Sequence, residues 1–368
     1  MRLKDVVLAA AWRTGLFSVV RDSRWRRRRL LILCYHGVSI DDEHEWNPEL
    51  YISQEQLRRR LRALRDGGYQ VLTLADATRR LYDGTLPPRS VALTFDDGAV
   101  DFEQRALPVL REFNAPATVY LTTYYCGTRL PVFDTMLSYV LWKGRHGSHD
   151  VASLCHARDP LPISTPEQRK RAWKALREFA DAGALSAVDK DGLLSRLAVL
   201  VGVDYASLRA RALLHIMSED TVRALPRDLI DVQLHTHRHR APRDRDLFLR
   251  EIKDNAAVIR QLRGERTPME HFCYPSGEYF GEFLGWLGEC DVHFATTCLP
   301  DLSSAHTHPL LLPRFVDTSF HSDVLFDAWT SGFAALLPRR RRYRPDAVRL
   351  ATVTHLLSES EVEQERIA

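Results

Sequence analysis

Short apolar runs alternate with amphipathic segments along much of this 368-residue chain. Runs at 30–35, 91–95, 118–122 and 229–234 are rich in Val, Ile, Leu and Thr, which predicts buried strands. Between them stand segments such as 54–66, where apolar residues recur three and four positions apart and predict helices. This alternation favours a parallel sheet covered by helices. About seven or eight strands favour an irregular (β/α) barrel over an open, doubly wound sheet.

The alternation stops between about 127 and 220, where polar breaks separate helical segments. One helix in this stretch has a well-defined start. Thr165 suits the N-cap, Pro166 suits the first turn, and Gln168 can complete a capping box. We therefore expect a helical insertion in the barrel, and its role stays open.

The strand and helix pattern returns after the insertion. A helix is expected at 244–263, followed by strands at 271–274, 292–296 and 310–316. The barrel domain is accordingly expected to extend over residues 30–336.

The two ends of the chain are basic. Arginine runs occupy 26–29 and 339–342, and we divide the ends into a basic amphipathic helix over 1–29 and a basic tail over 337–368. Residues 3–20 suit a helix that either packs on the domain or lies on an anionic membrane surface. Both interpretations remain open from the sequence.

Composition and cysteine usage bear on compartment and partners. The formal net charge is only +3, and no recognition motif accompanies the arginine runs, so we expect no nucleic-acid partner. The six cysteines lie far apart without a CxxC pair, which indicates free thiols in a reducing compartment. The sequence shows neither a signal-peptide pattern nor the about 18 consecutive apolar residues of a membrane-spanning helix, which predicts a cytoplasmic protein. A second expectation is that the protein binds the inner face of the membrane.

Two adjacent acids follow the buried run at 91–95. Asp96 and Asp97 precede Gly98, whose freedom at positive φ permits a tight turn. Buried carboxylates are costly unless they are paired, hydrogen-bonded or bound to metal. The C-terminal ends of strands in α/β folds also carry ligand sites. From this motif alone, a capping turn and a functional site are equally favoured.

Three histidines, His235, His237 and His239, follow the run at 229–234. In an extended segment all three face one way, whereas in a helix the first and third share a face. Either geometry presents two imidazoles to one metal ion, and a purely structural role is the alternative. Two histidines and one carboxylate leave coordination positions open, which is typical of a catalytic metal site. The other acid of the pair would then be free to accept a proton.

Three strings carry a resemblance to a known family. TFDDG at 94–98, HTHRH at 235–239 and YPSG at 274–277 resemble the motifs of the polysaccharide deacetylases, the NodB-type carbohydrate esterases. The resemblance covers about 30–125 and 215–320. It implies a distorted (β/α) barrel of the polysaccharide deacetylase type that removes acetyl groups from glycans. It also implies one divalent metal ion, with Zn²⁺ as the expected ion.

The resemblance implies a role for each matching residue of the first two strings. Asp96 would be the general base. The metal ligands would be Asp97, His235 and His239. His237 occupies a position where the family pattern does not require histidine, so we expect it to have a supporting or surface role.

The third string departs from the family pattern. Tyr274, Pro275 and Ser276 are the expected oxyanion and substrate-binding segment, with the backbone N–H of Ser276 as the oxyanion donor. Where the family commonly has an arginine that orients the base, this chain has Cys273. Arg314 is a candidate replacement, and a loop-anchoring role for it is the alternative.

The proton donor has two candidate locations. The string LCYHGV at 33–38 resembles the poly-N-acetylglucosamine deacetylase branch, which implies that His36 protonates the leaving amine. The family's usual C-terminal acid motif is not evident, although His306 and His308 lie in that region. The sequence favours His36 and leaves the other two open.

We therefore expect a metal-dependent hydrolase that removes acetyl groups from N-acetylated sugars. Its substrate would be a polysaccharide or a lipid-linked oligosaccharide in bacterial surface-glycan biosynthesis. An O-deacetylase or another amide hydrolase with the same site is one alternative, because metal, base and acid would be unchanged. A non-catalytic glycan-binding barrel is the other.

Overall fold

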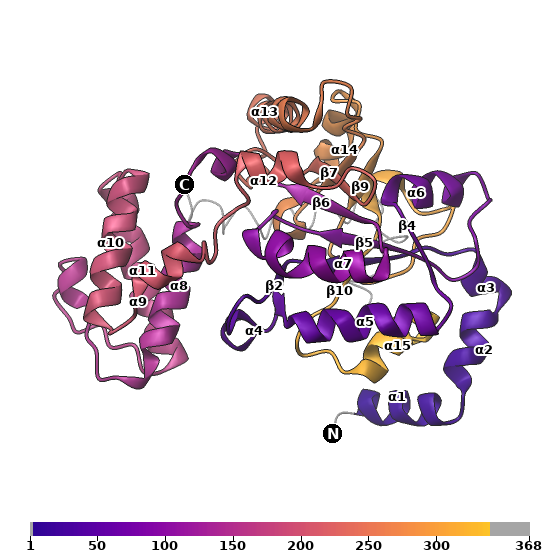
Figure 1. The fold of residues 1–368 in the computed structure, drawn as a ribbon, viewed down its shortest axis with the longest axis horizontal. Helices are drawn as coiled ribbons and strands as arrows, with labels where there is room; N and C mark the ends of the chain where they lie inside the picture. Colours follow the sequence, from indigo (N-terminus) through magenta and orange to yellow (C-terminus); the bar gives the residue numbers. More distant parts are fainter. Residues whose placement is uncertain (1–2, 339–368) are drawn as a thin grey trace.

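A curled parallel sheet forms the centre of the computed structural model, which describes residues 3–338 (Figure 1). The expected tail over 337–368, with its arginine run, lies almost entirely outside the described residues. Within them the main sheet is built from β1 Leu31–Tyr35, β4 Gln70–Leu72, β5 Ser90–Phe95, β6 Ala117–Leu121, β7 Ile230–Leu234, β8 His271–Cys273, β9 Phe294–Thr296 and β10 Phe315–Val316.

The strand order is β10-β1-β5-β6-β7-β8-β9, and β4 pairs with the start of β5. All of these pairs are parallel. An isolated parallel bridge joins Thr296 of β9 to Leu312, shortly before β10. The segment between β9 and β10 therefore brings the two edges of the sheet close together. This is the distorted barrel that the sequence predicts, and the fold prediction is confirmed.

Alternate residues of the inner strands face opposite sides of the sheet. Leu31 and Leu33 belong to the large core that packs under the helices. Ile32, Ala92 and Tyr120 belong to a smaller core on the other side. Polar side chains that continue this second series along β1 and β5 are therefore carried into the barrel interior.

Helices surround the sheet on its outer side (Figure 1). The helices of the barrel are α5 Gln54–Asp66, α6 Leu74–Tyr82, the π-helical segment η1 Phe102–Ala106, α7 Leu107–Phe113, α12 Glu219–Ala224, α13 Arg245–Arg263, α14 Gly281–Gly288, α15 Asp323–Ser331 and α16 Phe333–Leu336. Short elements complete it: β2 Gly37–Val38, α4 Glu43–Trp46, β3 Tyr51–Ile52, and the 3₁₀ turns η5 Pro275–Gly277 and η6 Pro309–Leu311. None of the described helices combines the length and apolar character needed to cross a bilayer.

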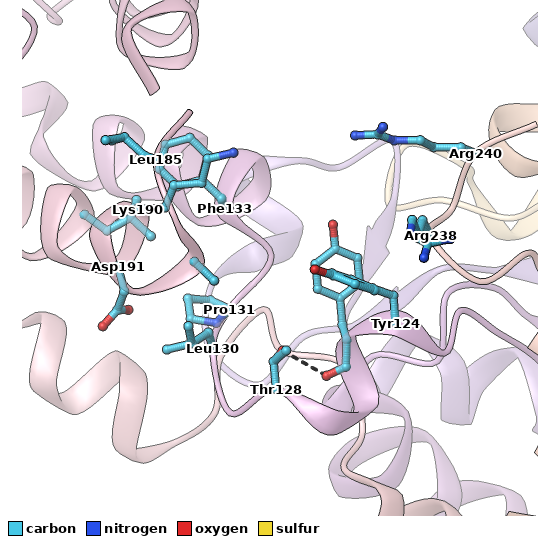
Figure 2. A pocket seen from close by; sticks show the side chains of 13 residues that line it. Tyr124, Thr128, Leu130, Pro131, Phe133, Leu185, Lys190, Asp191, Arg238 and Arg240 are labelled. Carbon is cyan, nitrogen blue, oxygen red and sulfur yellow. Dashed lines mark hydrogen bonds between the residues drawn. The ribbon is translucent and has the colours of Figure 1, made fainter. Parts of the chain in front are cut away.

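The helical insertion lies between β6 and β7 and projects to one side of the barrel (Figure 1). It contains the 3₁₀ turns η2 Tyr124–Gly127, η3 Gly144–His146 and η4 Ala152–Leu154, and the helices α8 Phe133–Lys143, α9 Pro166–Ala182, α10 Ala187–Leu200 and α11 Tyr205–Ala210. The capping box of α9 forms as its sequence predicts. These helices bury a core of their own around Leu137, Leu176 and Leu197. A cleft separates α10 from the barrel (Figure 2).

The expectation of one helix over 3–20 is wrong. The N-terminal region forms three short helices, α1 Leu3–Arg13, α2 Leu16–Asp22 and α3 Arg24–Arg27. Gly15 stands at φ 74° between the first two, a left-handed conformation that ends a helix. The arginine run is also not wholly solvated, because Arg26 is fully buried and donates to the carbonyl oxygens of Thr330, Arg29 and Ser90.

The expected strand at 310–316 is mostly absent. Residues Pro309–Leu311 form a 3₁₀ turn, and only Phe315–Val316 pairs with β1. Pro309 and Pro313 have no N–H to donate to a strand ladder, which explains why this apolar run pairs only at Leu312, which bridges to β9, and at Phe315–Val316.

Candidate active site

The candidate residues meet at the C-terminal edge of the sheet. His36 follows β1, and Asp96 and Asp97 follow β5. His235 follows β7, and Tyr274 follows β8. Because the carboxyl ends of parallel strands lie at one edge, residues that are far apart in the sequence come together there.

Asp97, His235 and His239 form the tightest group of possible metal ligands. The Nε2 atoms of both histidines point at the same carboxylate oxygen, Oδ1 of Asp97, at 3.1 Å for His235 and 3.2 Å for His239. The side chain of His235 is 2% exposed, whereas those of Asp97 and His239 are each 35% exposed. The group is therefore fixed from inside the barrel and open to solvent on the other side.

The backbone of this group is strained. Asp97, Thr236 and His239 have φ values of 67°, 62° and 57°, which are uncommon for residues with a side chain. Such conformations cost about 1–3 kcal/mol each and are found mainly at functional sites, where surrounding contacts hold them. At Thr236 one such contact is visible, because its Oγ1 accepts a hydrogen bond from Arg240 N at 3.0 Å.

The orientation of His235 is set by groups behind it. Its Nδ1 lies 2.8 Å from the carbonyl oxygen of Cys273, which fixes Nε2 toward Asp97. Its backbone N–H donates to Asn255 Oδ1 at 2.9 Å. The Asn255 amide in turn donates to Leu121 O and to Thr123 Oγ1, both at 2.9 Å. The strand end is therefore held by a buried, fully used asparagine of α13.

Asp96 is bound by Arg314 in the barrel interior. The guanidinium donates from Nη1 to Oδ1 at 2.6 Å and from Nη2 to Oδ2 at 2.7 Å, which is a bidentate pair. Arg314 also donates to Thr94 Oγ1 and Thr297 O, and it is fully buried. The structure thus brings together the acid and the arginine that the sequence named as its candidate partner.

The charges of the site shift the ionisation of both acids. Burial alone would raise the pKa of Asp96, but the Arg314 guanidinium outweighs it and holds that pKa well below its usual value. Burial likewise opposes ionisation of Asp97, and His239 and His235 overcome it and lower its pKa. Both carboxylates are therefore ionised at neutral pH.

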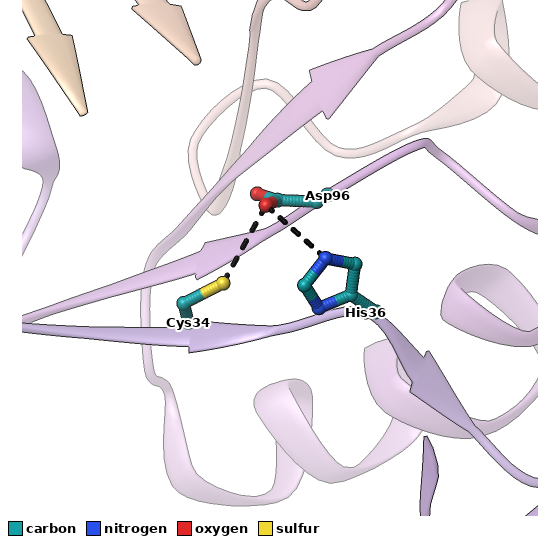
Figure 3. Close-up of side chains that lie close together, drawn as sticks. All are labelled: Cys34, His36 and Asp96. Atoms are coloured by element: carbon teal, nitrogen blue, oxygen red, sulfur yellow. Dashed lines mark hydrogen bonds and ion pairs between the residues drawn. The ribbon is translucent and has the colours of Figure 1, made fainter. Parts of the chain in front are cut away.

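His36 lies beside the same Asp96 carboxylate that Arg314 binds. Its Nε2 is 3.6 Å from Asp96 Oδ2, and Figure 3 shows the ring directed at the carboxylate. The side chain is 20% exposed, so it can reach a group in the mouth of the barrel. Its Nδ1 is buried with no hydrogen-bond partner among the described residues.

Two further clusters contain possible ligand atoms. One joins Cys34, His36 and Asp96 (Figure 3), and the other joins Asp96, His235 and Cys273. Both depend on Asp96, whose two oxygens are already occupied by a guanidinium. Burial raises the pKa of Cys34 and of Cys273 well above the usual value, which keeps both thiols protonated. The group around Asp97 is therefore the best candidate metal centre.

The other residues predicted for the site are Tyr274, Pro275, Ser276 and the two alternative proton donors. Tyr274 is fully buried and its hydroxyl donates to Leu310 O at 3.0 Å, so its ring does not reach the mouth of the barrel. Ser276 follows at φ 57° in the turn after Pro275. His308 instead caps η6, where its Nδ1 accepts from Leu310 N at 3.1 Å.

His306 is exposed, and neither it nor His308 belongs to any of the ligand clusters found in the described part of the chain. Of the three candidate proton donors, only His36 lies beside Asp96. His237 points away from the metal group, with its Nδ1 2.9 Å from Thr123 Oγ1.

Two supporting residues were not singled out from the sequence. Asn255 had a visible signal, because it is a polar residue on the apolar face of a predicted helix, next to Ala256. Cys34, whose Sγ lies 3.5 Å from Asp96 Oδ2, had none beyond its place in an apolar run. Cys273, whose Sγ lies at the same distance, was noted only as the residue in place of the family's arginine.

Comparison with known proteins supports this description. Residues 83–184 match the family model described as polysaccharide deacetylase. Bacillus subtilis YxkH, whose name assigns it to the polysaccharide deacetylases, is 27% identical over 156 residues, 42% of this chain and 52% of that protein. The Escherichia coli poly-β-1,6-N-acetyl-D-glucosamine N-deacetylase is 31% identical over 101 residues, 27% of this chain and 15% of its own length. The chain thus spans about half of the first relative and a small part of the second.

Solved structures share the fold. The Streptococcus pyogenes deacetylase PplD, solved in complex with acetate, superposes with a TM-score of 0.53 at 17% identity, covering 84% of this chain and 99% of that one. IcaB from Ammonifex degensii superposes with a TM-score of 0.52 at 16% identity, covering 82% and 97%. Part of the chain, residues 83–184, thus matches the polysaccharide deacetylase family model, and the chain as a whole shares the fold of solved deacetylases.

Proposed function

We propose that this protein is a metal-dependent hydrolase that removes acetyl groups from N-acetylated sugars of a glycan. The observation that carries the proposal is the pairing of two different acid environments at one strand end. Asp97 faces two imidazoles in a partly open site, whereas Asp96 is buried against Arg314. Such a pair separates metal binding from proton transfer.

The residues around Asp97 fit a divalent cation. Two imidazole nitrogens and one carboxylate oxygen converge within 4.8 Å of one another, and the set leaves the solvent side open. This mixed nitrogen and oxygen set suits Zn²⁺, which is the ion we propose. When bound, such an ion would polarise the acetyl carbonyl and lower the pKa of a neighbouring water.

Asp96 would accept the proton of the attacking water. It is ionised because Arg314 holds its pKa down, and the bidentate contact fixes the direction of its carboxylate. A strongly lowered pKa makes a weak base in isolation, so proton transfer to Asp96 would depend on the acidity that the cation gives the water. The backbone N–H of Ser276, in the turn after Pro275, is the proposed oxyanion donor.

His36 would donate a proton to the leaving amine. Amines leave poorly as anions, so cleavage of the C–N bond requires an acid within reach. The imidazole lies 3.6 Å from Asp96 and is partly open to the mouth of the barrel. It can therefore reach a leaving group held next to Asp96.

Acetate release from chitotetraose, measured together with bound metal, tests the proposal. We expect about one metal ion per wild-type chain and measurable acetate release. Asp96→Asn should keep the metal and lower the rate by about 10²–10⁴-fold, because it removes the base but none of the three proposed ligands. His235→Ala should lose both metal and activity. A wild-type protein that binds no divalent ion, or an Asp96→Asn variant with full activity, would contradict the proposal.

We further propose that the protein works at the cytoplasmic face of a membrane, on a lipid-linked glycan. Six free cysteines suit a reducing compartment. The N-terminal helices expose apolar side chains, with Val19 68% and Trp12 51% exposed, beside the exposed basic residues Arg24, Arg27 and Arg28. Apolar and basic groups together favour anionic bilayers.

Flotation with vesicles of phosphatidylglycerol and phosphatidylcholine tests this location. The protein should float at low salt, and Val19→Asp should reduce the floating fraction, because a charge would then oppose insertion of α2. The control is Val199→Asp in α10, where an equally apolar residue is 80% exposed. Recovery of the wild type only in the soluble fraction would exclude membrane binding.

A further inference from the structure

A cleft of about 300 Å³ lies between the helical insertion and the loop that carries His239 (Figure 2). On the insertion side it is lined by Phe133 and by Lys190 of α10. On the barrel side it is lined by Tyr124, Arg238 and Arg240. The volume lies at the lower end of the range of about 300–1,000 Å³ that small-molecule sites occupy.

The barrel wall of the cleft is built on the candidate metal centre itself. Arg238 and Arg240 stand on either side of His239 in the chain. Tyr124 is tied to the same loop, because its N–H donates to His237 O at 2.8 Å. A glycan bound with its acetyl group at the metal centre would therefore have the cleft as its neighbouring space.

The cationic side chains of the cleft are not equivalent. Arg238 donates to Glu251 Oε1 at 2.9 Å, and Lys190 lies 3.6 Å from Asp181, so both have partners of their own. Arg240 is exposed, and its guanidinium makes no hydrogen bond or ion pair with any described residue. Its charge acts only at longer range, on Asp134 and Tyr125.

The acidic side chain that lines the cleft does not balance this charge. Asp191 is bound by the guanidinium of Arg209 and by the hydroxyl of Tyr205. Arg240 is thus the charged side chain of the cleft that an anionic ligand could bind without breaking an existing ion pair.

The aromatic groups add a flat apolar surface beside that charge. The Tyr124 ring is 47% exposed and stands edge-on to the rings of Tyr125 and His237, at 5.2 and 5.6 Å between centroids. These two rings, together with the Arg238 guanidinium over the Tyr124 ring at 5.6 Å from its centroid, fix the orientation of a large exposed aromatic side chain. A fixed aromatic face next to a polar group suits the apolar C–H face of a sugar ring.

We propose that this cleft binds an anionic group on the part of the glycan adjoining the acetylated sugar, with Arg240 pairing with the anion and Tyr124 stacking on the sugar ring. The inference rests on the proposed function and narrows its substrate to acidic or phosphorylated glycans. The anion is a carboxylate or a phosphate, since a guanidinium pairs with either in the same planar, bidentate geometry.

Calorimetric binding to the full-length protein tests the inference with three probes. Chitotetraose is neutral, a hyaluronan tetrasaccharide carries carboxylates, and UDP-N-acetylglucosamine carries a diphosphate. We expect one of the charged probes to bind at least about tenfold more tightly than chitotetraose at low salt, and the preference to fall as salt rises. The preferred probe identifies the anion as carboxylate or phosphate.

Variants test whether the preference for a charged probe comes from the cleft. Arg240→Ala should remove it and leave binding of chitotetraose unchanged, whereas Tyr124→Ala should weaken all three probes. Arg62→Ala, which removes an exposed arginine of α5 far from the cleft in the chain, is the matched control and should change nothing. Equal binding of the three probes by the wild type, or a charge preference that survives Arg240→Ala, would overturn the inference.

Acetate release separates this result from a failure of the proposed function. If the wild type deacetylates neutral and charged probes equally, and Arg240→Ala does not alter KM, the cleft inference fails while the deacetylase stands. If Arg240-dependent binding is found but no probe releases acetate, the proposed function fails and the binding site stands.

Discussion

The Asp96–Arg314 pair shows how one side chain can set the chemistry of another. Removing one partner of a buried pair typically costs about 3–5 kcal/mol, because the remaining charge has no solvent. Arg314→Ala would therefore threaten folding as well as activity. Arg314→Lys keeps the charge and replaces the two parallel hydrogen bonds with a point contact, so it isolates the geometric contribution.

Arg314→Lys should lower kcat and move the acid limb of the kcat–pH profile to higher pH. Arg314 lowers the pKa of Asp96, so a weaker contact raises that pKa, and the base becomes protonated at a higher pH. Bound metal should stay near the wild-type level, because Arg314 contacts none of the three proposed ligands. A variant whose acid limb coincides with that of the wild type would show that Arg314 only anchors the loop.

His36→Gln should reduce kcat by about 10²-fold or more with little change in metal content, because it removes the proposed proton donor but no ligand. The two alternative donors provide the comparison, since His306→Gln and His308→Gln should retain wild-type kcat. An esterase assay with 4-nitrophenyl acetate adds a second readout. Its leaving group needs no proton, so His36→Gln should affect that reaction far less. Equal losses on both substrates would argue against His36 as the acid.

At the scale of helices and strands, the sequence predicted an element's end correctly where neighbouring residues alone determine it. The capping residues Thr165 and Gln168 gave the start of α9, and the DDG turn gave the end of β5. Gly15, by contrast, lies within the segment expected to form one helix, and nothing in the pattern required its left-handed conformation. The strand predicted at 310–316 rests on an apolar run, and Pro309 and Pro313 are what interrupt it.

The candidate site likewise contains residues that the sequence indicated and contacts that it could not indicate. Their places after two predicted strands brought the acid pair and the histidines forward as one possible metal site, and the family resemblance singled out Asp97, His235 and His239 as its ligands. The contact between Arg314 and Asp96 joins the residue before β10 to the end of β5, with β1 between these two strands in the sheet, so it depends on where the segment that leads into β10 lies. The support that Asn255 gives to His235 depends likewise on how α13 packs, which periodicity does not specify.

Gly98 lies in the turn that ends β5 and is next to the proposed metal ligand Asp97, so the conformation of this turn affects the candidate site. It stands at φ 78°, and a Cβ at this position would lie 2.3 Å from Leu121 Cδ1. Gly98→Ala should therefore lower the free energy of unfolding by about 1–3 kcal/mol through strain and overpacking. It should also reduce metal affinity, because the neighbouring residue is Asp97. Urea denaturation and metal titration measure the two effects.

Gly84→Ala is the matched control, since Gly84 has a similar φ of 71° with nothing within 4 Å of the added Cβ. It should show the conformational cost alone and no change in metal binding. If Gly98→Ala behaves like this control, the turn after β5 is less constrained than its packing against Leu121 implies.

At the scale of the whole molecule, a barrel filled with side chains must accommodate the polar groups that its strands carry inward. His271 of β8 is fully buried, stacks on Phe294, and has no hydrogen bond to either ring nitrogen among the described residues. Burial lowers its pKa to about 3. The imidazole is therefore neutral in the folded protein over most of the accessible pH range, and it contributes apolar contact rather than charge.

This histidine should make the folded state sensitive to acid. In the unfolded chain its pKa is about 6.5, so below that pH the unfolded state binds a proton that the folded state does not. Its contribution to stability is complete above pH 6.5 and declines by up to about 1.4 kcal/mol per pH unit as the pH falls toward 3.

His271→Phe keeps an aromatic ring in the same space without a titrating group. The free energy of unfolding of this variant, measured in urea from pH 8 to pH 4, should therefore fall less steeply than that of the wild type, whereas the exposed-site control His146→Gln should follow the wild type. Parallel curves for His271→Phe and the wild type would mean that His271 becomes protonated within the folded barrel.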